Sequence, residues 1–414
     1  MTSLAELPLF DGVDAPTLRD AKPRALCTDC GVSRSSDPSR CGKACQFIAP
    51  RYPELEVQVH GRMRDPHRGD EAHFGAYRRM VRARLRAPLA GAQWSGITTR
   101  LGERLLELGL VDAVIATAAQ PDDRWAPMPV LVTAAEGMQA CRGMKMGFSP
   151  VLALLEEAAA RGYRRLAIVG VPCQVHALRA LESELGLERL YVIGTPCSDN
   201  TTTARFHQFL ALLDAEPQRI RYLEFLTDFT VEIRFDDGRE RRIPFLNLPL
   251  RDLPPDFFPE TCRVCVDYSN ALADITVGYM GGEGQQWLVV RNDRGEELVA
   301  LLDGELEESP LTSSGSRAGP VQSLRGALER AQGGLPLRRA PQFMRPLISW
   351  AMRRFGPKGL EFARARVEMK LVEAVLTLRR TRPRRLHRML PASAWPLVQP
   401  YTLEPRLDER GGTS

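Results

Sequence analysis

The chain has 414 residues, of which 44% are hydrophobic and 26% charged, and its formal net charge is +5. This composition is ordinary for folded protein of two or three domains and excludes a largely disordered chain. No apolar run approaches the ~20 residues that a membrane-spanning helix needs, and the opening MTSLAELPLF has no secretory character. We therefore expect a soluble cytoplasmic enzyme, with no nucleic-acid partner and with a homo-oligomer as one option.

Four cysteines crowd the N-terminal segment with the spacing C-x2-C-x10-C-x3-C. They are Cys27, Cys30, Cys41 and Cys45, called here the first cysteine set. A disulfide framework does not suit a chain of this length, which can bury a core without covalent staples. Thiolate ligands in a reducing cytosol fit better. Because no histidine stands among the ligand positions, spacing alone leaves an iron–sulfur cluster and a four-cysteine zinc site both open.

A helix with one apolar face is predicted from Gly96 in GITTRLGERLLELGL, and VDAVIATA after it predicts a buried strand. The preceding GAQWSGITT offers glycines for close backbone approach and the hydroxyls of Ser95, Thr98 and Thr99. A helix N-terminus favours phosphate, so a nucleotide-sized ligand is one interpretation of this segment. An ordinary helix cap built from small residues explains the pattern as well.

One βαβ unit is predicted in the middle of the chain. Residues 166–169 (LAIV) and 190–193 (LYVI) read as strands, with an amphipathic helix over about 174–185 between them. Cys173 follows the first strand in GVPC, and Cys197 follows the second in GTPC. Parallel neighbours would carry both thiols to one carboxyl edge of the sheet, where ligands bind in open α/β sheets.

Cys262 and Cys265, in TCRVC, would complete a four-thiolate site if their loop folds back to that edge. With Cys173 and Cys197 they form the second cysteine set. The alternative is that Cys173 and Cys197 are merely small buried hydrophobes. Cys141, alone in QACRGMK, has no partner spacing, and we interpret it as structural.

The C-terminal half mixes hairpin and helix signals. FTVEIRFDDGRERRIPF (229–245) predicts a hairpin that turns at Asp237-Gly238, and WLVVRNDRGEELVALL predicts another around Arg294-Gly295. A stretch rich in Ser, Gly and Pro, from about residue 307 to 341, predicts a connecting segment. Helical patterns resume in PLISWAMRRF and GLEFARARVEMKLVEAVL.

Arginines concentrate near the end, in LRRTRPRRLHRM. They are Arg379, Arg380, Arg382, Arg384, Arg385 and Arg388. A solvated face is the plain interpretation. Docking of an acidic redox partner and peripheral contact with an anionic membrane are the alternatives, because both use long-range attraction.

Ordered blocks along most of the chain resemble the family of deazaflavin-dependent hydrogenase and dehydrogenase beta subunits, and within it the ferredoxin-dependent tetrapyrrole reductases. The blocks are CTDCG, VHGR at Val59 to Arg62, GAQWSGITT, RGMK at Arg142 to Lys145 with Ser149-Pro150, GVPCQVHALR, LERLYVIGTPCSDN, CRVCVDYSNALADITVGYMG, LVVRNDRG and GPKGLEFAR at Gly356 to Arg364. So many blocks in one order are more specific than any one cysteine pair.

The resemblance implies a flavoprotein that holds FAD and two 4Fe-4S clusters, and this favours iron over zinc. The second cysteine set matches the family position by position. Plant-type members continue the opening motif as C-x2-C-G-x-C, whereas this chain has Ser33 at the third position. We therefore expect Cys41 to replace the usual third ligand of the first cluster.

The resemblance also assigns the flavin-contacting stretches. The residues expected to bind the cofactor are Trp94, Ser95, Gly96, Thr98, Thr99, Arg142, Lys145 and Asn270. Arg142 and Lys145 suit a pyrophosphate or a reduced, anionic flavin, while Trp94 could stack on a ligand or simply pack.

Three further residues of these blocks carry two interpretations each. Asn270 and Asp274 could contact a cofactor or fix their own loop. His176 could hydrogen-bond near Cys173, or be a surface histidine with its own partners.

For function, the resemblance implies that electrons pass from reduced ferredoxin through the clusters to FAD and reduce the 8-vinyl group of a 3,8-divinyl (proto)chlorophyllide a to ethyl. The Arg- and Ala-heavy composition favours this reaction over reduction of the 7-hydroxymethyl group of a chlorophyll. An electron-transferring beta subunit of a larger deazaflavin-dependent enzyme is the alternative from another class. No residue is predicted as the proton donor, which geometry must identify.

The expected architecture is an α/β fold: a mixed sheet core with a βαβ unit, an N-terminal iron–sulfur segment and a C-terminal helical appendage. The expected divisions are an iron–sulfur segment over 1–85, a flavin and second-cluster core over 86–305, a linker over 306–341 and a basic helical region over 342–414.

Overall fold

The structure is a computed structural model of the chain, described here for residues 12–21, 24–226, 228–279, 284–333, 341–406 and 409. Its centre is a mixed sheet of nine strands: β1 (Val13–Asp14), β2 (Arg79–Leu85), β3 (Ala113–Ala119), β4 (Pro127–Val132), β5 (Arg165–Gly170), β6 (Arg189–Gly194), β10 (Ile275–Gly278), β11 (Gln286–Val290) and β12 (Leu306–Ser309). Their order is β1-β4-β3-β5-β6-β10-β11-β2-β12. The expected α/β fold around a mixed sheet is confirmed.

The βαβ unit lies at the middle of this sheet. Strands β3, β5, β6 and β10 run parallel, and the outer strands pair antiparallel. β5 and β6 stay in register to their last residues, where Gly170 lies opposite Gly194. Helix α6 (Pro172–Leu181) makes the connection. Because both strands end at the same level, the turns that carry Cys173 and Cys197 leave the sheet side by side.

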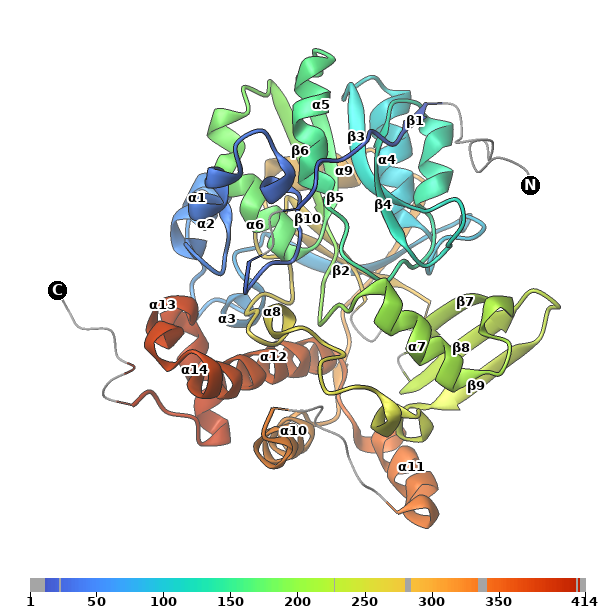
Figure 1. Ribbon diagram of the computed structural model, residues 1–414, viewed down its shortest axis with the longest axis vertical. Helices are drawn as coiled ribbons and strands as arrows, with labels where there is room; N and C mark the ends of the chain where they lie inside the picture. The colour runs from blue at the N-terminus through green and yellow to red at the C-terminus, as the bar shows by residue number, and fades with distance from the viewer. Residues whose placement is uncertain are drawn as a thin grey trace.

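Helices cover both faces of the sheet (Figure 1). Alternate residues of β3 show the two faces: Val114 packs with α4 (Ile97–Glu107) and α9 (Asp293–Ala300), and Ile115 packs with α6 and α5 (Leu154–Ala160). This alternation is what a strand buried on both faces requires. The carboxyl edge of the parallel strands is left for the loops.

The N-terminal segment packs on the α6 side of the sheet. It holds the short turns η1 (Val32–Arg34) and η2 (Pro38–Arg40), then α1 (Cys41–Ala44), α2 (Tyr52–His60) and α3 (Glu71–Phe74). Helices α1 and α2 both contact α6, and Figure 1 shows them beside it. The first cysteine set is therefore carried by short turns that rest on the βαβ unit.

A small antiparallel sheet forms a lobe of its own beside α7 (Thr203–Leu213). Its strands are β7 (Ile220–Phe225), β8 (Thr230–Phe235) and β9 (Glu240–Pro244). The predicted hairpin with its turn at Asp237-Gly238 is confirmed, with Gly238 at a φ of 83°.

The second predicted hairpin, around Arg294-Gly295, is wrong. Strand β11 is followed by helix α9, because the Asn292 side chain accepts a hydrogen bond from the Gly295 N–H at 3.0 Å and caps the helix. Gly295 also lies so close to the Asp274 carbonyl oxygen that a Cβ would come within 2.3 Å of it. The Arg-Gly pair signals close helix packing here and not a hairpin turn.

The C-terminal helices are present as predicted, and the segment 306–341 holds more than a connection. It contains β12, β13 (Ser313–Ser314), which pairs with β14 (Lys358–Gly359), and α10 (Ala318–Ala331). The remaining helices are α8 (Glu260–Arg263), α11 (Arg345–Phe355), α12 (Leu360–Thr381), α13 (Leu386–Met389) and α14 (Trp395–Val398). Eleven of the 22 residues of α12 are buried, so this helix belongs to the core. The exact division into domains remains a prediction.

The arginine-rich stretch is split between buried contacts and solvent. Arg379 pairs with Glu409 at 2.7 Å, and Arg382 pairs with Glu260 at 3.0 Å. Arg384, Arg385 and Arg388 are exposed. In the part of the chain described, no helix combines the length and apolarity that a bilayer crossing demands.

Candidate functional site

A cavity of about 480 Å³ lies at the carboxyl ends of β5 and β6. The loops after these strands, the N-terminal end of α4, the segment 141–149 and the end of β7 line it, and Thr28 and Gln46 reach it from the N-terminal segment. Open α/β sheets bind ligands at this edge. The cavity is therefore the candidate functional site.

The second cysteine set converges on this cavity. Cys173, Cys197, Cys262 and Cys265 all line it. Cys173 stands in the first turn of α6, and the Cys197 N–H donates to the Tyr268 carbonyl oxygen at 3.0 Å. Burial raises the pKa of the Cys262 thiol to about 12. The loop of residues 262–265 thus folds back to the sheet edge, which is the arrangement that a four-thiolate site requires.

The first cysteine set is gathered beside α6. Burial raises the pKa of the Cys30 thiol to about 12, and Cys45, Cys41 and Cys27 add smaller electrostatic contributions in the same direction. Cys41 therefore lies within electrostatic reach of the other three. Ser33, at the position where the related motif has its third cysteine, is buried, and its hydroxyl has no hydrogen-bond partner.

The two cysteine sets are neighbours. The Thr28 hydroxyl, between two cysteines of the first set, hydrogen-bonds to the Cys173 thiol. Gln46, which follows Cys45, donates from Nε2 to Cys265 Sγ at 3.7 Å. Any groups held by the two sets would therefore be separated by little more than these side chains.

The donor chemistry of the two sets fits iron–sulfur clusters. Each set supplies four cysteines, and a four-iron cluster takes one thiolate at each of its four irons. Burial raises the pKa of the Cys30 and Cys262 thiols, so cluster assembly there would release protons.

The N-terminal end of α4 offers a phosphate-type site. The helix has no side-chain cap, and Gly96 before it has a φ of 94°. The Ile97 N–H is taken by Gln286 Oε1 at 3.1 Å, and Thr98 and Thr99 line the cavity. Apart from this bond to Ile97, the helix start has no side-chain cap among the described residues, and a helix N-terminus that faces a cavity suits an anionic group such as a pyrophosphate.

Ser95 stands apart from the other residues of its block. It does not line the cavity: its hydroxyl accepts from the Leu85 N–H at 3.0 Å and donates to Gln286 Oε1 at 3.2 Å. These bonds fasten the loop before α4 to β2 and β11. The structure thus gives Ser95 a supporting position behind the cavity wall.

Two cations of the RGMK block reach the cavity. Lys145 Nζ donates to the Arg142 carbonyl oxygen at 2.7 Å, and burial lowers the pKa of this lysine to about 8. Arg142 pairs with Glu103 at 2.9 Å, while its buried Nε has no partner. Cys141, which the sequence left as structural, lines the same cavity. The free Arg142 Nε and the Lys145 ammonium can accept an anionic ligand.

An aromatic wall closes another side of the cavity. Trp94 packs against Tyr279, with ring centroids 5.2 Å apart, and Tyr279 packs against Phe362 of α12 at 5.3 Å. Trp94 and Tyr279 both line the cavity. Trp94 therefore packs and also presents its ring to a ligand.

Asn270 lies behind the site and not in it. It is fully buried and does not line the cavity, and its amide donates to the Gly170 carbonyl oxygen at 2.8 Å and the Thr195 carbonyl oxygen at 3.2 Å. These bonds tie together the two turns that carry Cys173 and Cys197. Of the two interpretations of Asn270, the structure supports loop fixation.

Asp274 is the centre of a buried ion-pair group. Its carboxylate meets Arg179 at 2.8 Å and Arg294 at 2.9 Å, and it also accepts from Asn292 and the Val192 N–H. Burial raises the pKa of Asp274, but the two arginines outweigh burial and hold it below its usual value. The group joins α6, β6, β10 and α9, so Asp274 also fixes structure.

His176 is not the surface histidine that the sequence suggested as the plain alternative. It is fully buried, with Nδ1 3.0 Å from the Ala44 carbonyl oxygen and Nε2 3.4 Å from the Arg51 amide nitrogen. Burial lowers its pKa to about 4. The neutral ring therefore links α6 to the segment of the first cysteine set.

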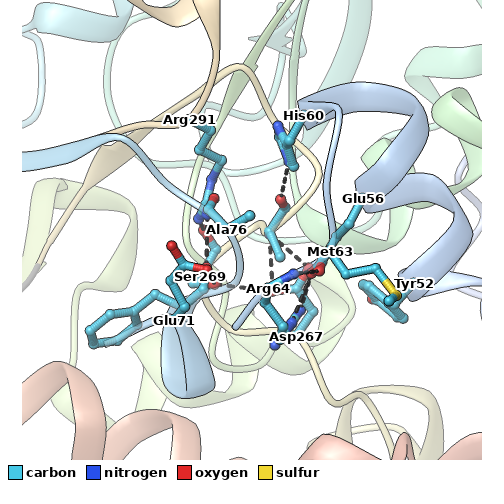
Figure 2. A network of polar contacts seen from close by, with 12 residues as sticks. Tyr52, Glu56, His60, Met63, Arg64, Glu71, Ala76, Asp267, Ser269 and Arg291 are labelled. Atoms are coloured by element: carbon cyan, nitrogen blue, oxygen red, sulfur yellow. Dashed lines mark hydrogen bonds and ion pairs between the residues drawn. The ribbon is translucent and has the colours of Figure 1, made fainter. Parts of the chain in front are cut away.

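A second buried network holds the loop that follows Cys265 (Figure 2). Arg291 donates to the Ser269 carbonyl oxygen at 3.0 Å and to the Phe74 and Ala76 carbonyl oxygens. Asp267 accepts from the Ala271 N–H at 3.0 Å. This network fastens the cysteine loop to the segment around Phe74 and Ala76.

Two polar residues of the cavity were missed by sequence reasoning. Lys370 of α12 donates to the Cys262 carbonyl oxygen at 3.0 Å and to Asp199 at 3.3 Å. Burial lowers the pKa of Lys370, but Asp199 and the nearby thiols outweigh burial and raise it. Glu224 of β7 also lines the cavity. The only sign of these residues in the local sequence was a charged side chain at a position where the pattern predicts a buried one.

Comparisons with known proteins agree with this arrangement. Sequence profiles described as coenzyme F420 hydrogenase/dehydrogenase, beta subunit, match residues 80–156 (N-terminal part) and 163–314 (C-terminal part). The chain is 37% identical over 404 residues to an uncharacterized protein of Nostoc sp., covering 97% of this chain and 100% of that protein.

Two further comparisons concern a plant protein and a solved structure. The chain is 37% identical over 396 residues to the chloroplastic 7-hydroxymethyl chlorophyll a reductase of Oryza sativa, covering 92% of this chain and 84% of the relative. Among solved structures, a chain of the F420-reducing [NiFe] hydrogenase complex of Methanosarcina barkeri aligns with a TM-score of 0.54 and 22% identity, over 72% of this chain and 91% of that one. This last likeness shows a shared fold.

Proposed function

The chain belongs to the coenzyme F420 hydrogenase/dehydrogenase beta-subunit family, and we propose that it is an oxidoreductase that reduces a chlorophyll-type pigment with electrons from reduced ferredoxin. The observation that carries the proposal is the shared cavity. The second cysteine set, the start of α4 and the aromatic wall all open into it. Clusters bound to the cysteines would accept single electrons, and a flavin bound near the start of α4 would deliver an electron pair.

We assign the cofactors by the donor groups that fit them. The first and second cysteine sets would each hold one 4Fe-4S cluster, with Cys41 as the third ligand of the first. The start of α4, Thr98, Thr99 and the Lys145 ammonium would hold the pyrophosphate of FAD. Bound there, FAD would supply hydride chemistry, and the clusters would supply single-electron transfer.

The residues around the cavity do the positioning. The rings of Trp94 and Tyr279, inclined at 37° to each other, give an apolar wall that suits a tetrapyrrole. Lys145, with a pKa of about 8, is charged at neutral pH and stabilises negative charge in the cavity. Lys370 places a second cation beside the second cysteine set.

The reaction we propose is reduction of the 8-vinyl group of 3,8-divinyl (proto)chlorophyllide a to ethyl. The relative from Oryza sativa, named for reduction of 7-hydroxymethyl chlorophyll a, favours that reaction as the second candidate. Both reactions add two electrons and two protons to a substituent at the rim of the pigment, so one cavity suits either.

The test is anaerobic turnover of the purified holoprotein with reduced ferredoxin and each pigment in turn, with products identified by mass. A gain of two hydrogens by divinyl chlorophyllide is the expected result. Conversion of only the 7-hydroxymethyl pigment would transfer the protein to the second candidate. Reduction of the bound flavin with both pigments unchanged would contradict pigment reduction and favour an electron-transferring beta subunit.

A Cys173→Ser variant serves as the control for the electron path. It should lose ferredoxin-driven turnover, because Cys173 lies in the second cysteine set and next to the first. Unchanged turnover in this variant would contradict the assignment of the second set to a cluster.

A further inference from the structure

The cavity holds one carboxyl group whose surroundings differ from those of every ion pair described above. Glu224 lies near the end of β7, is 7% exposed and lines the cavity. Its Oε1 is buried without a hydrogen-bond partner, and its Oε2 contacts the Tyr222 hydroxyl. An unpaired buried carboxyl oxygen costs free energy, so its retention beside a candidate active site calls for a chemical role.

The neighbouring strand supplies a carboxyl group for comparison. Glu232 of β8 lies directly opposite Glu224 in the small sheet. Its carboxylate pairs with Arg234 and with Arg242, each at 2.6 Å. Among the residues that the structure describes, no arginine pairs with Glu224. Two glutamates side by side are thus treated differently: one is neutralised by two guanidinium groups, and the other is left to hold a proton.

Burial and charge act on Glu224 together, and burial dominates. Burial raises its pKa most, Glu232 raises it less and Arg234 lowers it, and the three together bring it to about 7. Glu232 itself is held below its usual pKa: burial raises it, but Arg234 and Arg242 outweigh burial. Tyr279, across the cavity, has a pKa raised by burial, so it is neutral too. Paired groups whose pKa values are pushed apart are typical of acid–base assignments.

We propose that Glu224 is the acid that protonates the substrate in the reaction assigned above, with Tyr222 as the link through which it recovers its proton from solvent. This inference rests on the proposed function. Tyr222 is half-buried and touches Glu224 Oε2, so it joins the buried carboxyl to the surface of the small sheet.

The proton balance is the same for both candidate pigments. Two molecules of reduced ferredoxin supply two electrons. These electrons reach the pigment together with one proton, as a hydride. For the vinyl group, hydride adds to one carbon and the Glu224 proton adds to the other, so the double bond becomes a single bond. For the 7-hydroxymethyl group, hydride adds to carbon as the C–O bond breaks, and the Glu224 proton leaves with the hydroxyl as water. In each case Glu224 becomes a carboxylate and is then reprotonated.

The test uses the Glu224→Gln holoprotein, because glutamine keeps the shape of the side chain but has no acidic proton to donate. We expect kcat to fall about 100-fold or more, the scale typical of general acid catalysis, with KM little changed. In the wild type the rate should fall as the pH rises through about 7, since the acid form is lost. The glutamine variant should lose this pH dependence, and Glu224→Asp should restore part of the rate.

Glu232→Gln is the matched control on the neighbouring strand. It removes a negative charge that raises the pKa of Glu224, so kcat should stay within a few fold while the fall in rate shifts to lower pH. A role of Glu224 in structure alone would not produce this shift. Infrared spectra of the resting protein give a readout without turnover: a protonated-carboxyl band that titrates near pH 7 should be absent from Glu224→Gln.

The outcomes separate this inference from the proposed function. A Glu224→Gln protein that reduces pigment at the wild-type rate and with the wild-type pH profile would overturn the role of Glu224 and leave the function standing. Wild-type protein that reduces neither pigment would overturn the function and this inference with it. Flavin reduction by ferredoxin should be unaffected in Glu224→Gln, because the proton is needed only by the pigment.

Discussion

The two cysteine sets are built in different ways. The second set stands at the ends of the parallel strands β5 and β6 and on α8, held by the buried networks of Asp274 and Arg291. In the first set, Cys27 and Cys30 precede the turn η1, while Cys41 begins the short helix α1 and Cys45 follows it; α1 rests on α6, and none of the four lies in a strand. The register of the sheet edge therefore fixes the second set, whereas the first set depends on single close contacts.

The two sets also differ in whether the family profiles cover them. The second set lies within the residues matched by the family profiles, while residues 27–45 lie before the match begins at residue 80. The replacement of a cysteine by Ser33 falls in that unmatched segment. Three sets of variants test whether the two sites differ in this way.

The largest effect is expected from Asp274→Ala, which removes the centre of the ion-pair group behind the second set. The fully buried Arg179 would lose its buried partner and keep its pair with the half-buried Glu182, and the loss of one member of a buried pair costs about 3–5 kcal/mol. Urea unfolding of the holoprotein, followed by circular dichroism, measures this cost. Glu297→Ala, which breaks an exposed pair with Arg189, should cost at most about 1 kcal/mol. Equal losses in the two variants would show that Asp274 is no special support.

A smaller effect is expected from Gly31→Ala in the first set. Gly31 has a φ of 112°, and a Cβ there would lie 2.3 Å from the Ala153 backbone nitrogen and 2.6 Å from the Pro150 carbonyl oxygen. Strain and overpacking of this kind cost about 1–3 kcal/mol, and they would displace Cys30. We expect the electron paramagnetic resonance signal of the first cluster to weaken while that of the second persists.

Gly42→Ala is the control for this displacement. Gly42 lies next to Cys41 in α1, and a Cβ there would meet nothing within 4 Å. Alanine should stabilise this helical position by up to about 1 kcal/mol and leave the iron content unchanged. Loss of the first cluster in Gly42→Ala, or its full retention in Gly31→Ala, would contradict the dependence of this set on close contacts.

The smallest effect on folding, but the sharpest on composition, is expected from Cys41→Ser. Two four-iron clusters require about eight irons per chain, so loss of the first cluster should leave about four. The free energy of unfolding should change little, because Cys41 is one small residue on a short turn. Cys141→Ser, which alters a cavity thiol outside both sets, should keep all the iron. A Cys41→Ser protein that keeps about eight irons would remove Cys41 from the ligands.

Sequence patterns predicted those parts of the molecule that depend on local periodicity. The strands on either side of α6, and therefore the shared edge of Cys173 and Cys197, followed from two short apolar runs and the turns after them. The hairpin predicted around Arg294-Gly295 was wrong because one cap, from Asn292, turned the segment into a helix. A single hydrogen bond of this kind leaves little trace in hydrophobic periodicity.

The missed residues depend on contacts between distant parts of the chain. Lys370 reaches the second set from a helix more than a hundred residues away in sequence. The raised pKa of Glu224 depends on burial and on Glu232, which lies on the next strand. Asn270 looked like a ligand because it lies in a shared block, yet its bonds go to the backbone of two turns. Motifs identified the right blocks, and only geometry separated the residues that face the cavity from those behind it.

The position of Lys370 bears on how the protein is made. Helix α12 closes the cavity wall beside the second cysteine set, and it is among the last helices of the chain to be synthesised. While the ribosome still holds that helix, the sheet and both cysteine sets can fold, but the wall beside Cys262 is absent. A chain whose synthesis has not yet reached α12 thus lacks the wall beside Cys262, and this side of the cavity closes only once α12 has been made.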